Sequence, residues 1–318
     1  MIDLDALAAG GKPALARALA ALERDADGGA TLALLDAAHA RRRAPVIGIT
    51  GPPGVGKSTL VGALIAAWRA RGTSVGVVAV DPSSRVSGGA LLGDRARIAS
   101  DPNDPGVFVR SLAARDRLGG LAELAMPAVT VLAALFDVVV VETVGVGQSE
   151  TAIADLADTL VLCIQPGAGD SLQYMKAGVA ETPDIAVVTK ADLRDAAARA
   201  AADLKAGLAL GAPGEWAVLV LLVSAPRRDG IELLMTEIER HQQWLDSDGR
   251  RDRRRAEQAR HWLEQAVRER FGREGLKHCG KLDPAEGQSP FARYREIVAN
   301  LMKGYGTKRD LQSGPGGG

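Results

Sequence analysis

The sequence predicts an α/β fold in which a mostly parallel sheet is flanked by helices on both faces. From Pro45 onward, short β-branched runs alternate with alanine-rich helical segments, as they do in chains built from strand–helix–strand units. A glycine-rich loop joins the first run to the first of these helices, an order common in parallel sheets. At 318 residues, the chain is long enough for one domain with helical segments at both ends.

Helical segments are expected before the first strand. Leucines recur at helical spacing between residues 15 and 35, and Asp27-Gly28-Gly29 interrupts the pattern. We therefore predict two short helices that cover the sheet domain. Residues 1–44 are assigned to this N-terminal helical segment.

Six apolar runs are predicted as strands of the sheet, and a seventh is expected at residues 107–110. Each run is short and rich in β-branched side chains, which favours buried parallel strands. Cys163 lies within one run and is expected to be a buried hydrophobe. Residues 45–240 are assigned to this domain. The six runs are 46–49, 75–80, 138–142, 159–164, 185–189 and 218–223.

The sequence becomes strongly charged toward its C-terminus. Residues 231–245 are amphipathic, and residues 250–271 are predicted to form a long helix with a narrow apolar stripe, which suggests packing against another subunit. Five arginines between residues 250 and 255 could contact nucleic acid, but the interleaved acids favour a solvated helix face. Residues 241–310 are assigned as a C-terminal helical arm, and residues 311–318 as a disordered tail.

The composition excludes several classes of function. The 39 basic and 39 acidic residues give a formal net charge of zero, which points to neither nucleic acid nor an anionic membrane. Aromatic residues make up only 3%, so no surface for single-stranded nucleic acid is expected. Cys163 and Cys279 lack the spacing of a zinc site. Without a long apolar stretch or a signal peptide, the protein is expected to be soluble and cytoplasmic.

Residues 51–58 (GPPGVGKS) match the pattern G-x-x-x-x-G-K-[ST]. They follow a predicted strand and precede a predicted helix, the context in which this pattern forms a phosphate-binding loop, or P-loop. Backbone N–H groups would cradle the phosphates, Lys57 would reach the β- and γ-phosphates, and Ser58 could bind Mg²⁺. The chain is therefore expected to bind a nucleoside triphosphate.

Three acidic residues are predicted to converge on the phosphates. Asp81 and Glu142 end apolar strands, and Asp94 follows in a glycine-rich segment. Ligands of parallel sheets sit at the carboxyl ends of the strands, and Mg²⁺ prefers hard oxygen ligands. For Asp81 the alternative is a turn-initiating role before Pro82. The loop after Glu142 contains Gly145, whose N–H is expected to contact the γ-phosphate and so make the loop sensitive to hydrolysis.

Residues 189–192 (TKAD) predict which base is bound. Guanine-reading GTPases have Asn-Lys-x-Asp here: the Asp accepts hydrogen bonds from guanine, and the Lys stem packs on the base. Adenine would leave the carboxylate of Asp192 unpaired, at a cost of about 1–3 kcal/mol. We therefore favour GTP over ATP, although Thr189 replaces the Asn. Ser224 and Ala225 are expected to close over the guanine from the other side.

Beyond the P-loop, five segments resemble those of one family, the MeaB/ArgK family. Its members are G-protein chaperones of adenosylcobalamin-dependent acyl-CoA mutases and are related to human MMAA. The resemblance extends from about residue 15 to residue 271, and residues 142–150 are its most specific part. The five segments are VDPSS at 80–84, GGALLGD at 88–94, VETVGVGQSE at 141–150, GDSLQ at 169–173 and KAD at 190–192.

The resemblance implies a P-loop NTPase of the SIMIBI type that binds GTP or GDP with Mg²⁺. It implies mobile switch segments around residues 81–94, 143–150 and 167–178. The residues expected to act in hydrolysis are Lys57, Glu142, Gly145, Gln148 and Lys176. Those expected to contact the nucleotide are Gly51, Pro53, Gly54, Val55, Gly56, Lys57, Ser58, Thr59, Lys190, Asp192, Ser224 and Ala225. Those expected to contact Mg²⁺ are Ser58, Asp81, Asp94 and Glu142.

The resemblance also implies partners. GTP binding and hydrolysis would gate delivery of adenosylcobalamin to an acyl-CoA mutase, and protection of that mutase, which is methylmalonyl-CoA mutase or a related enzyme. An adenosyltransferase would be an indirect partner, and a second copy would bind through the C-terminal helices. No arginine finger can be assigned, so intrinsic GTP hydrolysis is expected to be slow and partner-stimulated. Thr189 and Tyr174 depart from the family pattern, which suggests a divergent branch.

Two other functions were considered. A P-loop phosphotransferase, or kinase, acting on a small or protein substrate needs an acceptor pocket and a base for the acceptor hydroxyl, and neither occurs as a distinct motif. A GTPase that loads nickel would be expected to carry a His- or Cys-rich tract, and the chain has only four His. Neither nucleic acid nor a membrane is expected as a partner.

Overall fold

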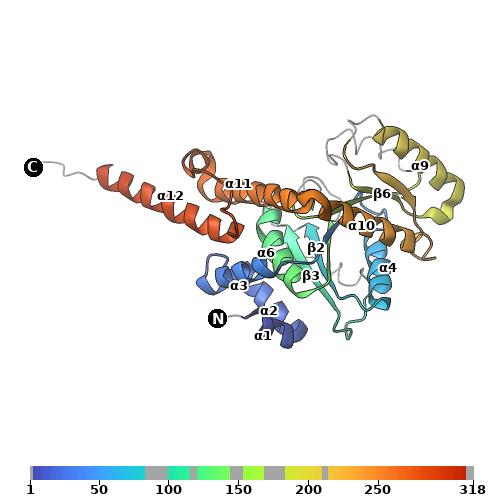
Figure 1. Ribbon diagram of the computed structural model, residues 1–318, viewed down its shortest axis with the longest axis horizontal. Helices are drawn as coiled ribbons and strands as arrows, with labels where there is room; N and C mark the ends of the chain where they lie inside the picture. Colours follow the sequence, from blue (N-terminus) through green and yellow to red (C-terminus); the bar gives the residue numbers. More distant parts are fainter. Residues whose placement is uncertain are drawn as a thin grey trace, which may run out of the picture.

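The computed structural model describes residues 3–82, 98, 100–114, 120–143, 153–167, 183–209 and 214–312. Seven parallel strands form one sheet in the order β3-β2-β4-β1-β5-β6-β7. Figure 1 shows helices packed beside this sheet. All the predicted strands are present, and the one expected at residues 107–110 is longer than predicted. The strands are β1 Val46–Thr50, β2 Val75–Pro82, β3 Val107–Ala114, β4 Val138–Thr143, β5 Thr159–Ile164, β6 Ile185–Val188 and β7 Leu219–Leu222.

The central strands are covered on both faces, which explains why they read as continuous apolar runs. Every residue of β1, β4, β5 and β6 is buried. One face packs against α4 (Lys57–Ala70) and α10 (Ile231–Asp246). The opposite face packs against α6 (Gly120–Leu135) and α9 (Arg194–Leu208). This is the predicted arrangement of a parallel sheet between two helical layers.

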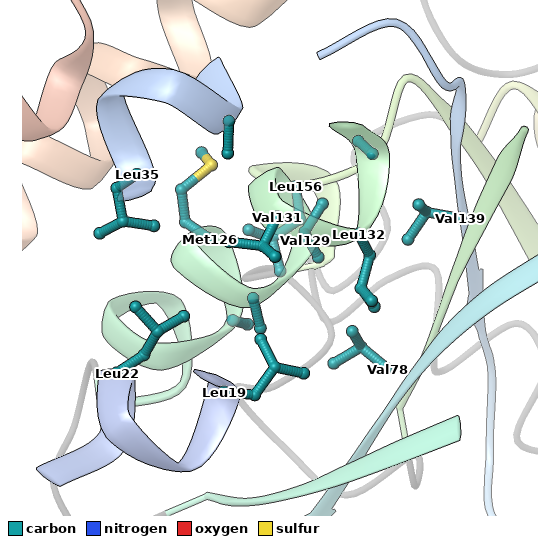
Figure 2. Close-up of a cluster of buried hydrophobic side chains, with 14 of the residues drawn as sticks. Leu19, Leu22, Leu35, Val78, Met126, Val129, Val131, Leu132, Val139 and Leu156 are labelled. Carbon is teal, nitrogen blue, oxygen red and sulfur yellow. The ribbon is translucent and has the colours of Figure 1, made fainter. Parts of the chain in front are cut away.

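Three N-terminal helices form a further layer, where two were predicted. They are α1 (Leu4–Ala9), α2 (Gly11–Arg24) and α3 (Gly29–Arg41). Figure 2 shows Leu19, Leu22 and Leu35 of these helices packed around Met126 and Val129 of α6. The N-terminal helices therefore cover the sheet domain, as predicted, largely by packing on α6.

The C-terminal arm begins after a short 3-10 turn, η2 (Ser247–Gly249), and consists of α11 (Arg250–His278) and α12 (Pro290–Gln312). α11 bends at Gly272, where φ is +66°, and so continues past residue 271. Its apolar stripe includes Trp262, Leu263 and Val267, which are buried in the same cluster as α6. This stripe therefore packs within the chain, and dimerisation through the C-terminal helices stays a prediction. α12 extends away from the sheet toward the C-terminus (Figure 1).

Of the five arginines between residues 250 and 255, Arg253 is exposed, but the other four are half-buried and do not form the solvated face that the sequence suggested. Arg255 binds the buried carboxylate of Asp158 through two nitrogens, at 2.8 and 2.7 Å. Arg254 binds Asp184 in the same way, at 3.0 and 2.8 Å. These aspartates come directly before β5 and β6, so the arginines fix α11 against the amino-terminal edge of the sheet. Arg251 lies 3.4 Å from the same Asp158.

Asp158 is expected to be critical for stability. Burial alone would raise its pKa, yet the bonds from Arg255 and the nearby positive charges hold that pKa below its usual value. Asp158→Asn would leave a cluster of guanidinium groups without its counter-charge, which costs about 3–5 kcal/mol. Chemical denaturation at pH 7 measures this loss. Asp252→Asn, at an exposed position of α11, is the control and should change little.

The same ion pair predicts that the free energy of unfolding decreases in acid. A carboxylate whose native pKa is depressed stabilises the fold above its unfolded-state pKa of about 3.9, and loses that effect as pH falls through the native value. Wild-type stability should therefore fall steeply below about pH 4, and the fall should be shallower in Asp158→Asn. Identical pH profiles for the two proteins would contradict the assignment.

Among the described residues, no helix is both long and apolar enough to cross a bilayer. Cys163 is fully buried, as predicted, and burial raises the pKa of its thiol to about 12. The division of the chain at residues 44, 240 and 310 stays a prediction.

Candidate functional site

The predicted site residues that the structure describes gather at the carboxyl edge of the sheet. β1 leads into the P-loop and pairs with β4, which ends beside Glu142, and with β5. β6 leads into residues 189–192 and pairs with β5. The carboxyl ends of β4, β1 and β6, far apart in the sequence, therefore lie at one edge of the sheet, with β5 between β1 and β6. This is the edge where parallel sheets bind ligands.

Backbone geometry explains the glycines of the P-loop. Gly51 has φ +140°, and a Cβ at this position would lie 2.0 Å from the carbonyl oxygen of Cys163 on β5. Gly54 and Gly56 also have positive φ, at +76° and +97°. α4 begins directly after Gly56, and no described side chain caps its first turn. The N–H groups of that turn therefore face the loop, as an anion site at a helix N-terminus requires.

Lys57 lies inside this loop. Its Nζ donates to the carbonyl oxygens of Gly51 at 2.6 Å and Pro52 at 2.9 Å, and only 6% of the residue is exposed. The ammonium charge is thus held against the backbone carbonyls at the start of the loop. An anion bound by the loop would meet both that charge and the helix N-terminus.

Two of the predicted Mg²⁺ ligands are in contact. The Ser58 hydroxyl donates to Oε1 of Glu142 at 2.6 Å, and Glu142 is buried. Glu142 lies opposite Ile49 in the β1–β4 pairing, which brings the end of β4 beside the P-loop. It also pairs with Ala79 of β2, so Asp81 lies two positions further toward the same edge. The side chain of Asp81, and all of Asp94, Gly145, Gln148 and Lys176, lie outside the described residues.

The oxygen atoms of Ser58 and Glu142 suit Mg²⁺. Mg²⁺ prefers hard oxygen ligands and is commonly held by one or two carboxylates together with substrate phosphates, not by a cage of protein ligands. Among the described residues no group of three His, Cys, Asp or Glu could hold a metal ion, but Asp94 and the side chain of Asp81 are not among them. The pair fits a metal whose other ligands include phosphate and water.

The predicted base-binding residues also come together. Residues 191–193 form the 3-10 turn η1 (Ala191–Leu193), and Oδ1 of Asp192 accepts a hydrogen bond from Ser224 Oγ at 2.7 Å. That bond lowers the pKa of Asp192, so the carboxylate is ionised at neutral pH. Ala225 follows Ser224 directly and begins a turn. Its carbonyl oxygen accepts a hydrogen bond from the N–H of Arg228. Lys190 reaches the P-loop, where its Nζ donates to the carbonyl oxygen of Gly54.

Thr189 has a role that the sequence did not indicate. Its hydroxyl lies 2.7 Å from the carbonyl oxygen of Val55 and 2.9 Å from that of Ile164, and can donate to either. The first contact links the end of β6 directly to the P-loop. The replacement of the family's Asn therefore does not simply delete a contact, because the threonine hydroxyl connects the two loops.

Comparison with known proteins identifies the chain. The family described as Methylmalonyl Co-A mutase-associated GTPase MeaB matches residues 15–277. The chain belongs to this family. The resemblance found in the sequence is thereby confirmed, and the match extends slightly beyond the predicted range.

Relatives in several organisms agree with this assignment. A provisionally named GTPase of Caulobacter vibrioides is 40% identical over 281 residues, which cover 85% of this chain and 86% of that protein. A provisionally named GTPase of Pyrococcus abyssi is 46% identical, over 64% of this chain and 64% of that protein's length. The mitochondrial methylmalonic aciduria type A homolog of Mus musculus is 34% identical, over 81% of this MeaB-family chain and 62% of that protein.

A solved structure supports the fold class. The crystal structure of LAO/AO transport system kinase matches 95% of this chain and 99% of that chain, with a TM-score of 0.65 and 25% sequence identity. The predicted α/β fold with added N- and C-terminal helices is therefore confirmed for this MeaB-family chain.

Proposed function

We propose that this MeaB-family chain binds GTP with Mg²⁺ at the carboxyl edge of its sheet and hydrolyses it. The observation that carries the proposal is the contact between Ser58 of the P-loop and Glu142 of β4, at the same edge as the base-binding residues. A phosphate loop, a metal-binding pair and a base-reading carboxylate are the three parts that GTP requires.

Each part has a chemical role in the proposal. The P-loop and Lys57 bind the β- and γ-phosphates. Ser58 and Glu142 hold Mg²⁺, with Asp81 and Asp94 as further proposed ligands, and the ion when bound neutralises charge on the phosphate oxygens. The N–H of Gly145 contacts the γ-phosphate, and Gln148 and Lys176 act in the switch segments.

Guanine is selected by Asp192 and Lys190. The ionised carboxylate accepts hydrogen bonds from the guanine ring N–H and amine, while Ser224 orients it through Oδ1. The stem of Lys190 packs on the face of the base. Adenine cannot satisfy the carboxylate, because it lacks these two donors.

In the proposal, GTP hydrolysis regulates a partner enzyme. We propose that the chain controls delivery of adenosylcobalamin to an acyl-CoA mutase, methylmalonyl-CoA mutase or a related enzyme, and protects that enzyme. The family description and the methylmalonic aciduria homologs support this role. In the proposal the chain acts as a homodimer joined through its C-terminal helices, and an adenosyltransferase is an indirect partner.

The GTPase rate, measured against added adenosylcobalamin-dependent mutase, tests this regulation. The isolated chain should turn over slowly, and the cognate mutase should accelerate it by on the order of tenfold or more, because it orders groups that stabilise transition-state charge. Gln148→Ala and Lys176→Ala should reduce that stimulation more than they reduce the basal rate.

The same assay separates the proposal from a phosphotransferase. With GTP labelled at the γ-position, a GTPase releases the label as inorganic phosphate, whereas a kinase transfers it to an acceptor. Release of phosphate at a rate indifferent to every candidate mutase would remove the chaperone role. Label on a small molecule or protein would establish the phosphotransferase instead.

A further inference from the structure

Lys190 is fixed at both its backbone and its ammonium group. Its backbone has φ +53°, so the chain enters the left-handed region shortly after β6 ends. Its Nζ donates to the carbonyl oxygen of Gly54 at 3.1 Å and to Oε1 of Gln165. Because Lys190 is exposed, these two acceptors, not burial, define the path of its side chain.

Gln165 reaches Lys190 from a separate loop. It is the first residue after β5 and is half-buried. β5 lies between β1, which leads into the P-loop, and β6, which leads into the base-binding residues. The N–H of Thr189 donates to the carbonyl of Ile164 at 2.8 Å, which keeps the start of the Gln165 loop beside the end of β6.

We propose that Gln165 is a positioning residue for guanine-nucleotide binding, which holds Lys190 in the orientation that covers the base. The inference rests on the proposed function, because it requires the base to lie against Lys190. Gln165 contacts the lysine ammonium. The groups proposed to bind phosphate belong to other residues, those of the P-loop. Gln165 therefore acts on nucleotide affinity and leaves the chemical step unchanged.

The physical basis is the conformational entropy of a long side chain. A free lysine samples many rotamers, and a base that packs on its stem must select one of them. Two fixed acceptors make this selection before the nucleotide binds, which is pre-organisation of the site. Release of one such side chain corresponds to roughly threefold to tenfold weaker affinity. Most of that change should appear as faster dissociation.

Stopped-flow dissociation of a fluorescent GDP analogue from the full chain tests the inference. Gln165→Met keeps the length of the side chain but removes the acceptor, and should speed dissociation roughly threefold to tenfold. Gln165→Glu keeps an acceptor and should retain slow dissociation. The rate of single-turnover hydrolysis at saturating GTP should match wild type in both variants.

A double-mutant cycle shows whether Gln165 acts through Lys190. In a Lys190→Met background, Gln165→Met should have no further effect. Gln288→Met, the same exchange in the loop before α12, should dissociate GDP as wild type does. Unchanged dissociation in Gln165→Met, or the same loss in both backgrounds, would overturn the inference. A wild-type chain that fails to bind guanine nucleotides would instead overturn the proposed function, and the inference with it.

Discussion

Replacing Lys57 by alanine is expected to abolish measurable GTP hydrolysis while the fold stays intact. The ammonium group lies within the P-loop, bonded to the carbonyls of Gly51 and Pro52, where it can meet the charge of a bound triphosphate. Loss of one charged donor of this kind weakens binding roughly tenfold to a hundredfold. Loss of its effect on developing charge lowers the rate by about 10²–10³-fold.

Isothermal titration with a non-hydrolysable GTP analogue measures the first effect, and phosphate release measures the second. Circular dichroism and thermal unfolding establish that the variant is folded. Lys205→Ala, at an exposed position on α9, removes the same charge far from the P-loop and should behave as wild type. A folded Lys57→Ala protein with unchanged nucleotide affinity would remove the phosphate-binding assignment.

Asp192→Asn is expected to change the preferred base from guanine to xanthine. Ser224 Oγ donates to Oδ1 of Asp192, and the asparagine side chain can keep that bond through its own oxygen. Its amide nitrogen would then face the base as a donor. Guanine presents a ring N–H and an amine there, so donors would oppose donors, whereas xanthine presents an oxygen in place of the amine.

Competition of GTP and xanthosine triphosphate for a fluorescent nucleotide measures this change. The affinity for GTP should fall by on the order of a hundredfold, as expected when hydrogen bonds to a charged group are lost. Asp195→Asn, on the exposed first turn of α9, is the matched control and should keep the wild-type preference. A wild-type protein that prefers ATP, or a variant without the change, would show that Asp192 does not read the base. Thr189→Asn should sharpen guanine selection only modestly.

The strands of the sheet, and the loops that follow β1 and β6, could be predicted because their signals are local. A strand buried on both faces needs a continuous run of apolar residues, and each such run in the sequence is a strand. Parallel strands end at a common edge, so the contact between Ser58 and Glu142 follows from the strand order, although 84 residues separate the two.

Other features depend on contacts that no local pattern encodes. Arg255 and Arg254 bind aspartates 97 and 70 residues away, while the neighbouring acids Asp252 and Glu257 are exposed. The interleaved charges therefore indicated a solvated helix face, whereas in the structure these two arginines form ion pairs with buried aspartates. α1 is only six residues long, too short for a periodic pattern to be distinguished.

Thr189 illustrates a third limit, because the motif pattern compares residue types and not their contacts. A threonine in place of asparagine looks like a loss, yet its hydroxyl lies within 2.7 Å of the Val55 carbonyl. Only the position of the P-loop relative to β6 reveals this contact.

The shared burial of the two chain ends has a consequence for synthesis on the ribosome. One apolar cluster contains Leu19 and Leu35 from the N-terminal helices, Leu132 from the middle of the chain, and Leu263 and Phe291 from the C-terminal helices. While a chain is still being translated, the N-terminal helices and α6 can pack together, but the surface that later receives α11 stays open to water. Contacts of such long sequence separation form slowly, and exposed apolar surface promotes aggregation meanwhile. The nascent MeaB-family chain thus depends on its last helices to cover its own hydrophobic face.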